Sequence, residues 1–355
     1  MKYKRKARFL SLFHPDSLSL HPIMKIVVDD KIPYIREKLQ MLADQVVAIP
    51  GAKIAPADVK DADALIVRTR TRCDEKLLAG SKVTFVATAT IGFDHIDVDY
   101  MERAGITWTS CPGCNAASVA QYLESALLLL QQQKGLQLDG ATIGIVGCGH
   151  VGQKVKNVAE RMGMRVLVCD PPVGSSDYVS LDVIEREADV ITFHVPLTRE
   201  GCYATWHMAD EAFFQRLSRV PYIINTSRGP VVDNNALLTA LCEKRVRDAV
   251  IDVWEGEPDI NLQLLKQAFI ATPHIAGYSA DGKTNADNMV IEALCHHFHL
   301  PNPGRIDPPS LPDGFHFTGD PLQLYNPIKD SEKLKNDPSL FESLRNNYPL
   351  RREKI

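Results

Sequence analysis

The sequence predicts an α/β protein with two doubly wound, Rossmann-like domains with parallel sheets, followed by a short C-terminal appendage. Two series of short apolar runs alternate with helical patterns, as repeated βαβ units do. A glycine-rich turn at residues 147–152 follows the first strand of the second series. The chain has 355 residues, which is more than a single domain usually holds. These observations together favour two domains.

The first series of elements begins at residue 24. Residues 1–23 are basic at the start and lack the apolar core and cleavage site of a signal peptide. We expect a disordered extension there, or an upstream start with Met24 as the true initiator, with a transit peptide as the remaining alternative. Asn115 is expected to cap a long helix that connects the two domains and runs to about residue 133. The other elements expected in this series are strands at residues 25–28, 64–67, 83–87 and 106–109 and a helix at 32–43.

The second series of strands ends near residue 271, and the composition changes again beyond residue 300. Seven prolines between residues 300 and 330 indicate mostly extended chain. A helix is expected from about residue 331 to 347, with Leu334, Phe341 and Leu344 on its apolar side. This tail is too short for a core of its own, so it must pack on its own chain or on a partner subunit. The strands expected in the second series are 143–146, 166–169, 190–193, 222–225, 249–253 and 269–271.

The glycine-rich turn indicates a dinucleotide site. In Gly147-x-Gly149-x-x-Gly152, the first glycine permits a tight turn, the second lets the backbone approach a pyrophosphate, and the third lets helix and strand pack closely. The helix that follows offers unpaired N–H groups to the phosphates. Asp170 ends the next strand, near the position of a ribose-binding carboxylate that repels a 2′-phosphate, so NAD is expected rather than NADP. The alternative is a glycine-rich turn in some other α/β protein.

Composition and charge argue against several other classes of protein. The net charge is −4, without the basic surplus of a protein that binds nucleic acid or a membrane surface, and no apolar run is long enough for a membrane span. The eight cysteines are scattered, which favours reduced thiols in a cytoplasmic enzyme. No metal site is expected, because Cys111 and Cys114 lack a second pair, and because His296, His297 and His299 cannot all face one ion.

Polar residues follow three successive strands of the second series and suggest a site for hydride transfer. Arg228 follows strand 222–225 and could hold a carboxylate with two hydrogen bonds. His274 follows the last strand and could take a proton from an alcohol near neutral pH. The strand between them delivers Asp252, Glu255 and Glu257, from which a glutamate could orient the imidazole. Such a set would serve the oxidation of a 2-hydroxy acid.

The motifs GCGHVG, HVPLT, NTSRGPVVDN, DVWEGEP and ATPHIAGY resemble those of the D-isomer-specific 2-hydroxyacid dehydrogenases. The resemblance covers residues 24 to 300 and continues faintly to residue 355. It implies that Arg228 binds and polarises the substrate, that Glu257 orients the histidine, and that His274 exchanges the proton. It also implies substrate contacts at Thr69, Thr90 and Tyr278. The expected contacts to NAD are Gly147, Gly149, His150, Val151, Gly152, Asp170, Val195, Thr226, Asp252 and Gly277.

The resemblance also implies a division into domains. Residues 24–114 with 278–300 would form a substrate-binding, flavodoxin-like domain, and residues 115–277 the NAD-binding domain. Residues 301–355 correspond to a segment that makes homodimers in the family, so a homodimer is expected, but the segment is short here and leaves the strength of the dimer open. Val195 stands where relatives can carry threonine, so only a backbone contact to NAD is expected there.

The motifs VRTRT, TATIGFDHID, CPGCNAASVAQY, CDPP and PHIAGYSADGK are most similar to the branch of the family that oxidises a small phosphorylated 2-hydroxy acid. Such a substrate carries an anion at each end. We therefore expect one of Arg68, Arg70 and Arg72 to meet the phosphate, a solvated basic loop being the alternative. Two other functions remain open: oxidation of phosphoglycerate, glycerate or lactate, and NAD sensing without catalysis, as in the corepressors of this family.

Overall fold

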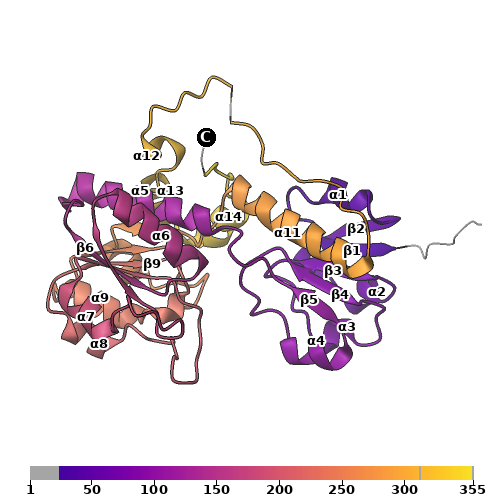
Figure 1. The fold of residues 1–355 in the computed structure, drawn as a ribbon, viewed down its shortest axis with the longest axis horizontal. Helices are drawn as coiled ribbons and strands as arrows, with labels where there is room; N and C mark the ends of the chain where they lie inside the picture. Colours follow the sequence, from indigo (N-terminus) through magenta and orange to yellow (C-terminus); the bar gives the residue numbers. More distant parts are fainter. Residues whose placement is uncertain (1–23, 312, 354–355) are drawn as a thin grey trace, which may run out of the picture.

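The computed structural model describes residues 24–311 and 313–353, so the expectation for residues 1–23 lies outside the described residues. Figure 1 shows two α/β lobes side by side, each built on one parallel sheet. This arrangement confirms the predicted fold class. The chain crosses between the lobes at the start of α5 (Ala116–Lys134) and again just before α11 (Ala280–Phe298). The two crossings are adjacent, since Ser118 Oγ donates to the carbonyl oxygen of Ala276 over 2.9 Å.

The first sheet has five parallel strands in the described part of the chain. They are β1 (Lys25–Asp29), β2 (Gln45–Ile49), β3 (Ala64–Val67), β4 (Phe85–Thr88) and β5 (Thr107–Thr109). Their order, β2-β1-β3-β4-β5, is the flavodoxin-like doubly wound order. α1 (Arg36–Gln40) and α11 pack on one face, although α11 comes late in the sequence. The other face is covered by α2 (Pro56–Val59), α3 (Glu75–Leu78) and α4 (Val98–Ala104).

Two expectations for this domain were wrong. The strand β2 was not predicted, although residues 46–49 form a continuous apolar run, because so short a run cannot be distinguished by its periodicity from part of a helix. The helix expected at residues 32–43 is only Arg36–Gln40. Pro33 explains the late start, because proline has no N–H and disfavours the helical conformation of the residue before it.

The second sheet has six parallel strands among the described residues. They are β6 (Thr142–Val146), β7 (Arg165–Cys169), β8 (Val190–Phe193), β9 (Tyr222–Asn225), β10 (Asp248–Ile251) and β11 (Ile270–Ala271). The order is β11-β10-β9-β8-β6-β7, with the topological switch between β6 and β8. Both faces are buried, which explains the nearly continuous apolar sequence of its inner strands.

Helices cover both faces of the second sheet. α5 and α6 (His150–Arg161) contribute to the core on one face. On the other face, the core includes residues of α7 (Leu181–Glu187), α8 (Glu211–Arg216), α9 (Asn234–Cys242) and α10 (Leu262–Gln267). The carboxyl ends of β8, β9 and β10 are followed by residues that line the space between this domain and the first one.

The C-terminal segment packs on its own chain. It contains α12 (Pro321–Leu324), α13 (Ile328–Asn336) and α14 (Phe341–Asn346). The single helix expected at residues 331–347 is broken at Pro338, which cannot donate the backbone hydrogen bond of a helix interior. Leu334 and Phe341 are fully buried in the core of the second domain. Ser331 Oγ accepts the N–H of Ala271 over 2.9 Å, so the segment covers the end of the sheet at β11.

Within the described residues, no helix combines the length and the apolar character that crossing a bilayer requires.

Candidate active site

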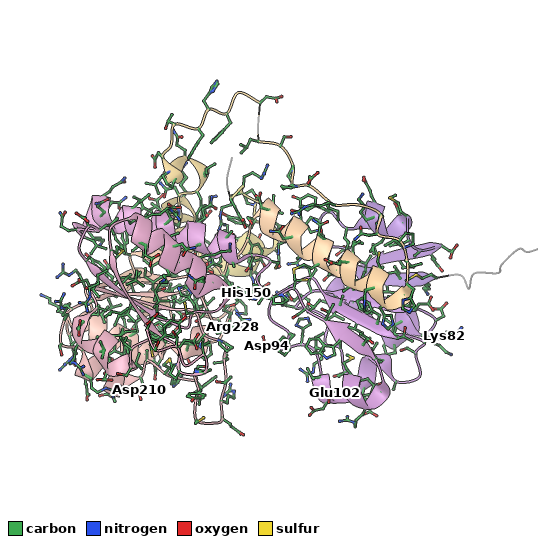
Figure 2. The ribbon with its side chains drawn as sticks, in the orientation of Figure 1. Lys82, Asp94, Glu102, His150, Asp210 and Arg228 are labelled. Atoms are coloured by element: carbon green, nitrogen blue, oxygen red, sulfur yellow. The ribbon has the colours of Figure 1, made fainter. Side chains whose placement is uncertain are left out.

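A cleft of about 760 Å³ lies between the two domains. This volume is in the usual range for sites that hold small ligands and cofactors. Figure 2 shows Arg228 of the second domain and Asp94 of the first facing one another there, with His150 close by. Among the predicted site residues, those that line the cleft are Thr69, Thr90, His150, Val151, Val195, Thr226, Arg228, Asp252, His274, Gly277 and Tyr278.

Arg228 is positioned by the loop that follows β9. Asn225 Nδ2 donates to the carbonyl oxygen of Arg228 over 3.0 Å, and the guanidinium donates from Nη1 to the carbonyl oxygen of Ser227 over 2.8 Å. Its Nη2 lies against Gly92 of the first domain and 3.9 Å from Asp94 Oδ2. A side chain at position 92 would overlap the guanidinium in this position, so Arg228 would have to shift to accommodate it. Arg228 thus reaches across the cleft with donors still available for an anion.

His274 and Glu257 form a hydrogen-bonded pair. Nδ1 of His274 is 2.9 Å from Glu257 Oε2, while Glu257 Oε1 accepts the N–H of Trp254 over 2.9 Å. Burial raises the pKa of Glu257, but His274, the N–H of Trp254 and Arg345 outweigh burial and hold it below its ordinary value. Glu257 therefore stays ionised and can hold a proton on Nδ1, which leaves Nε2 available for a substrate.

The turn that carries His274 is held by Asp252. Its carboxylate accepts the N–H groups of Ile275 and Ala276 over 2.8 and 2.9 Å and the hydroxyl of Thr272 over 2.6 Å. These bonds stabilise His274 in a left-handed conformation with φ of 58°. A non-glycine residue in this region is strained, and such strain is common at functional sites. The structure thus gives Asp252 a supporting role in addition to its place on the cleft wall.

Of the three carboxylates after β10, Glu257 is the one that reaches the histidine. Glu255 pairs instead with His207, at 2.7 Å, and accepts the N–H of Asn234 over 2.9 Å. Sequence reasoning from the residues could not choose between the two glutamates, because both lie in the same loop.

The glycine loop has the geometry that the motif predicts. Gly147 has a φ of 90°, and α6 begins directly after Gly149. Gly152 lies against the carbonyl oxygen of Gly147, so that any side chain there would overlap it. Asp170 at the end of β7 accepts the N–H of Cys148 over 2.7 Å, which places its carboxylate beside the loop. The three glycines and Asp170 do not line the cleft, whereas His150 and Val151, at the start of α6, do.

Besides Nε of Arg68, three buried polar atoms on the cleft wall lack partners in the described protein. They are Oγ1 of Thr226, Nδ1 of His194 and Oδ1 of Asn115. Burial lowers the pKa of His194 to about 3, so its imidazole is neutral at neutral pH. Buried polar groups are nearly always hydrogen-bonded, so such atoms favour a polar ligand in the cleft. Together with the glycine loop and Asp170, they fit a dinucleotide.

Only one of the three arginines after β3 lines the cleft. Arg68 lines it, together with Thr69 and with Thr90 after β4. Arg70 instead forms an ion pair with Glu342 of α14, and Arg72 is exposed and 3.4 Å from Asp74. Thr90 Oγ1 donates to the carbonyl oxygen of Gly92 over 2.9 Å, which fixes the loop opposite Arg228.

Sequence reasoning missed two cations of the cleft. Lys283 lies in the first turn of α11, and Arg345 lies in α14. Arg345 Nη1 is 3.4 Å from Glu257 Oε2, so the C-terminal segment reaches the His274–Glu257 pair. Lys283 could have been noted within the motif PHIAGYSADGK, whereas nothing in the sequence around Arg345 distinguishes it from a surface arginine.

The cysteines of the CPGC sequence are buried thiols. Cys111 Sγ is 3.4 Å from the carbonyl oxygens of both Thr88 and Ala286. Burial raises the pKa of Cys114 to about 11 and raises that of Cys111 further. Both thiols are therefore protonated at neutral pH, as expected of structural cysteines.

Asp287 on α11 is expected to make the stability of the protein depend on pH. Burial raises its pKa from 3.8 to about 7, although its carboxylate accepts the N–H of Tyr34 over 3.2 Å. Between these values the folded protein binds more protons than the unfolded chain, so stability falls as pH rises. We predict that Asp287→Asn raises the free energy of unfolding relative to the parent, and by more at pH 8 than at pH 5. Urea unfolding at both pH values measures this, and a difference independent of pH would contradict it.

Comparison with known proteins identifies the family. The chain is 55% identical to the erythronate-4-phosphate dehydrogenase of Bacteroides fragilis, over 93% of this chain and 97% of that protein. It is 42% identical to the enzyme of the same name from Escherichia coli O1:K1, over 93% of this chain and 92% of that protein. The chain belongs to the D-isomer-specific 2-hydroxyacid dehydrogenase family. The family model for the NAD-binding domain of these dehydrogenases matches residues 119–276.

Solved structures of the family share the fold of this dehydrogenase. A D-lactate dehydrogenase from Aquifex aeolicus, in complex with NAD and lactic acid, has a TM-score of 0.66 at 27% identity and covers 78% of this chain and 95% of its own. An NAD⁺-bound 3-phosphoglycerate dehydrogenase from Entamoeba histolytica has a TM-score of 0.67 at 30% identity, with the same coverage. The dehydrogenase uses NAD, and its NAD-binding domain is the one that carries the glycine loop.

Proposed function

We propose that this dehydrogenase oxidises 4-phospho-D-erythronate to 2-oxo-3-hydroxy-4-phosphobutanoate, a step of vitamin B6 synthesis, in the cytoplasm. The observation that carries the proposal is the cleft itself, which combines Arg228 and the His274–Glu257 pair with a second group of cations at Arg68, Lys283 and Arg345. A substrate with a carboxylate at one end and a phosphate at the other matches both groups. The names of the relatives at 42–55% identity support the same substrate.

In the proposed reaction, Arg228 binds the carboxylate of the substrate and stabilises the charge that develops on the C2 oxygen. Nε2 of His274 takes the proton of the C2 hydroxyl group. Glu257 holds the proton on Nδ1 and stabilises the imidazolium that forms. Bound NAD would supply the acceptor for the C2 hydride. The residues of the glycine loop with Asp170, and Val151, Val195, Thr226 and Gly277 on the wall, would hold it.

Oxidation rates with a panel of hydroxy acids test this proposal. The panel contains 4-phospho-D-erythronate, D-erythronate, D-3-phosphoglycerate, D-glycerate and D-lactate, and formation of NADH is measured. Hydrogen bonds to a charged group are worth about 1.5–3 kcal/mol each, so two of them to the phosphate should favour the phosphorylated over the unphosphorylated erythronate by about 10²-fold or more in kcat/KM. Equal rates for these two, a preference for another acid, or no turnover at all would reject the proposed substrate.

We further propose a homodimer, on the basis of the family resemblance of the C-terminal segment. Because Leu334 and Phe341 of this segment are buried in their own chain, they are not available to a partner, and we expect the dimer to dissociate on dilution. Analytical ultracentrifugation over a range of protein concentrations tests this expectation.

A further inference from the structure

Three cations lie together on the cleft wall, and we call them the cation cluster: Arg68, Lys283 and Arg345. They come from three separate parts of the chain, namely the loop after β3, the first turn of α11, and α14. All three line the cleft between the domains, and so does Tyr278. The ammonium group of Lys283 is 4.3 Å from the centre of the Tyr278 ring.

The hydrogen bonds within the protein do not satisfy the cation cluster. Arg68 donates from Nη1 to the carbonyl oxygen of Lys31 over 3.1 Å, but its Nε is buried without a partner. Lys283 has no carboxylate within ion-pair distance among the residues that the structure describes. Arg345 touches Glu257, which it shares with His274. All three residues are half-buried, and a cation that is partly removed from water without a counter-ion of its own is costly, so the arrangement favours an anionic ligand.

The pKa values of the ionisable groups around the cation cluster indicate that positive charge is in excess there. Burial lowers the pKa of Lys283, and Arg68 adds to this effect, while Tyr278, Cys114 and Asp287 oppose it without restoring the ordinary value. Burial raises the pKa of Tyr278, but Lys283, Arg345 and Arg68 outweigh it and bring the pKa below its ordinary value. The nearby carboxyl of Asp287 has a pKa of about 7, so it is only partly ionised at neutral pH.

The C-terminal segment holds Arg345 in this place. Phe341 anchors α14 in the core of the second domain, and Glu342 forms an ion pair with Arg70, two residues after Arg68 in the first domain. α14 therefore connects the second domain to the loop that carries Arg68. Because Phe341 and Glu342 fix the start of α14, Arg345 on its next turn stays beside Glu257.

We propose that Arg68, Lys283 and Arg345 form the subsite for the phosphate group of the substrate, so that the C-terminal segment completes the active site of its own chain. The inference rests on the proposed function. A phosphate monoester is close to a dianion at neutral pH, and it accepts charge-assisted hydrogen bonds from guanidinium and ammonium groups. Arg228 then holds the carboxylate at the other end of the substrate.

Substitutions in the cluster test the subsite with paired substrates. For Arg68→Gln, Lys283→Met and Arg345→Met, we expect the KM for 4-phospho-D-erythronate to rise at least 100-fold, and the KM for D-erythronate to change much less. Arg72→Gln is the matched control, because Arg72 lies on the same loop as Arg68 but is exposed and beside Asp74. It should leave both KM values unchanged. Equal losses on both substrates in the cluster variants would overturn the proposal.

A second measurement does not depend on turnover. Inorganic phosphate should raise the thermal midpoint of the full-length protein, and this increase should disappear in Lys283→Met but persist in Arg72→Gln. An increase that persists in Lys283→Met would also overturn the proposal.

If the proposed substrate itself is wrong, the experiment gives a different result from the one expected when only the phosphate subsite is wrong. In that case the parent protein does not oxidise 4-phospho-D-erythronate. Inorganic phosphate would then be tested as a competitive inhibitor of whichever hydroxy acid it does oxidise. Inhibition that weakens in the cluster variants would support the phosphate subsite, and inhibition that is equal in all variants would reject it.

Discussion

His274→Asn is expected to lower kcat by about 10³-fold or more while the Kd for NAD stays within about threefold of the parent value. General acid–base catalysis by a positioned side chain contributes about 10²–10⁴ to the rate, and asparagine cannot take the proton of the hydroxyl group. His274 lies on the wall of the cleft, and its Nδ1 contacts Glu257. The imidazole ring is therefore not part of the glycine loop, and its loss should leave that loop able to bind NAD. Stopped-flow measurement of NADH formation gives kcat, and fluorescence titration gives the affinity for the cofactor.

Glu257→Gln is the companion variant for this prediction. The amide oxygen can still accept a hydrogen bond from Nδ1, but the charge that stabilises the imidazolium is lost, so we expect a smaller loss in kcat of about 10²-fold. A His274→Asn protein that keeps more than a tenth of the parent kcat would rule out the assigned proton transfer. A protein that only senses NAD would show no turnover in the parent either, which separates that alternative from catalysis.

Arg351→Met is expected to lower the free energy of unfolding by about 3–5 kcal/mol, because it leaves several buried acceptors without donors. Arg351 is 8% exposed. Its Nη1 donates to the carbonyl oxygens of Ile275 and Tyr278 over 3.1 and 2.8 Å, and its Nη2 to that of Ala276 over 2.6 Å. Its Nε donates to Gln121 of α5 over 2.9 Å. The side chain therefore ties the C-terminal segment to the loop after His274 and to the helix between the domains.

Arg352→Met provides the control for this prediction at the neighbouring position. Arg352 is less buried and forms an ion pair with Asp281 over 2.9 Å, so we expect a loss of about 1 kcal/mol. Urea unfolding measures both variants. Because Arg351 supports the loop between His274 and Tyr278, its substitution should also reduce kcat/KM at temperatures at which the protein is still folded. Similar losses of stability in the two variants would show that the buried hydrogen bonds of Arg351 are not important for the fold.

The local sequence determined the two sheets, the glycine loop and the polar residues that follow the strands. Strands such as Ala64–Val67, Val190–Phe193 and Tyr222–Asn225 lie where their apolar runs predicted them, because an inner strand of a parallel sheet is buried on both faces and needs apolar side chains at nearly every position. The edge strand Gln45–Ile49 was missed because its apolar run of four residues is too short for its periodicity to tell a strand from a helix.

Only the tertiary structure decided which charged side chains share the cleft. Arg68 faces it whereas Arg70 and Arg72 do not, and the sequence RTRTR treats the three alike. Arg345 lies 88 residues from Glu257 in the chain, so no local pattern relates them. Whether two distant charges meet depends on how the domains and the C-terminal segment pack, and that packing is fixed by the apolar cores rather than by the charges themselves.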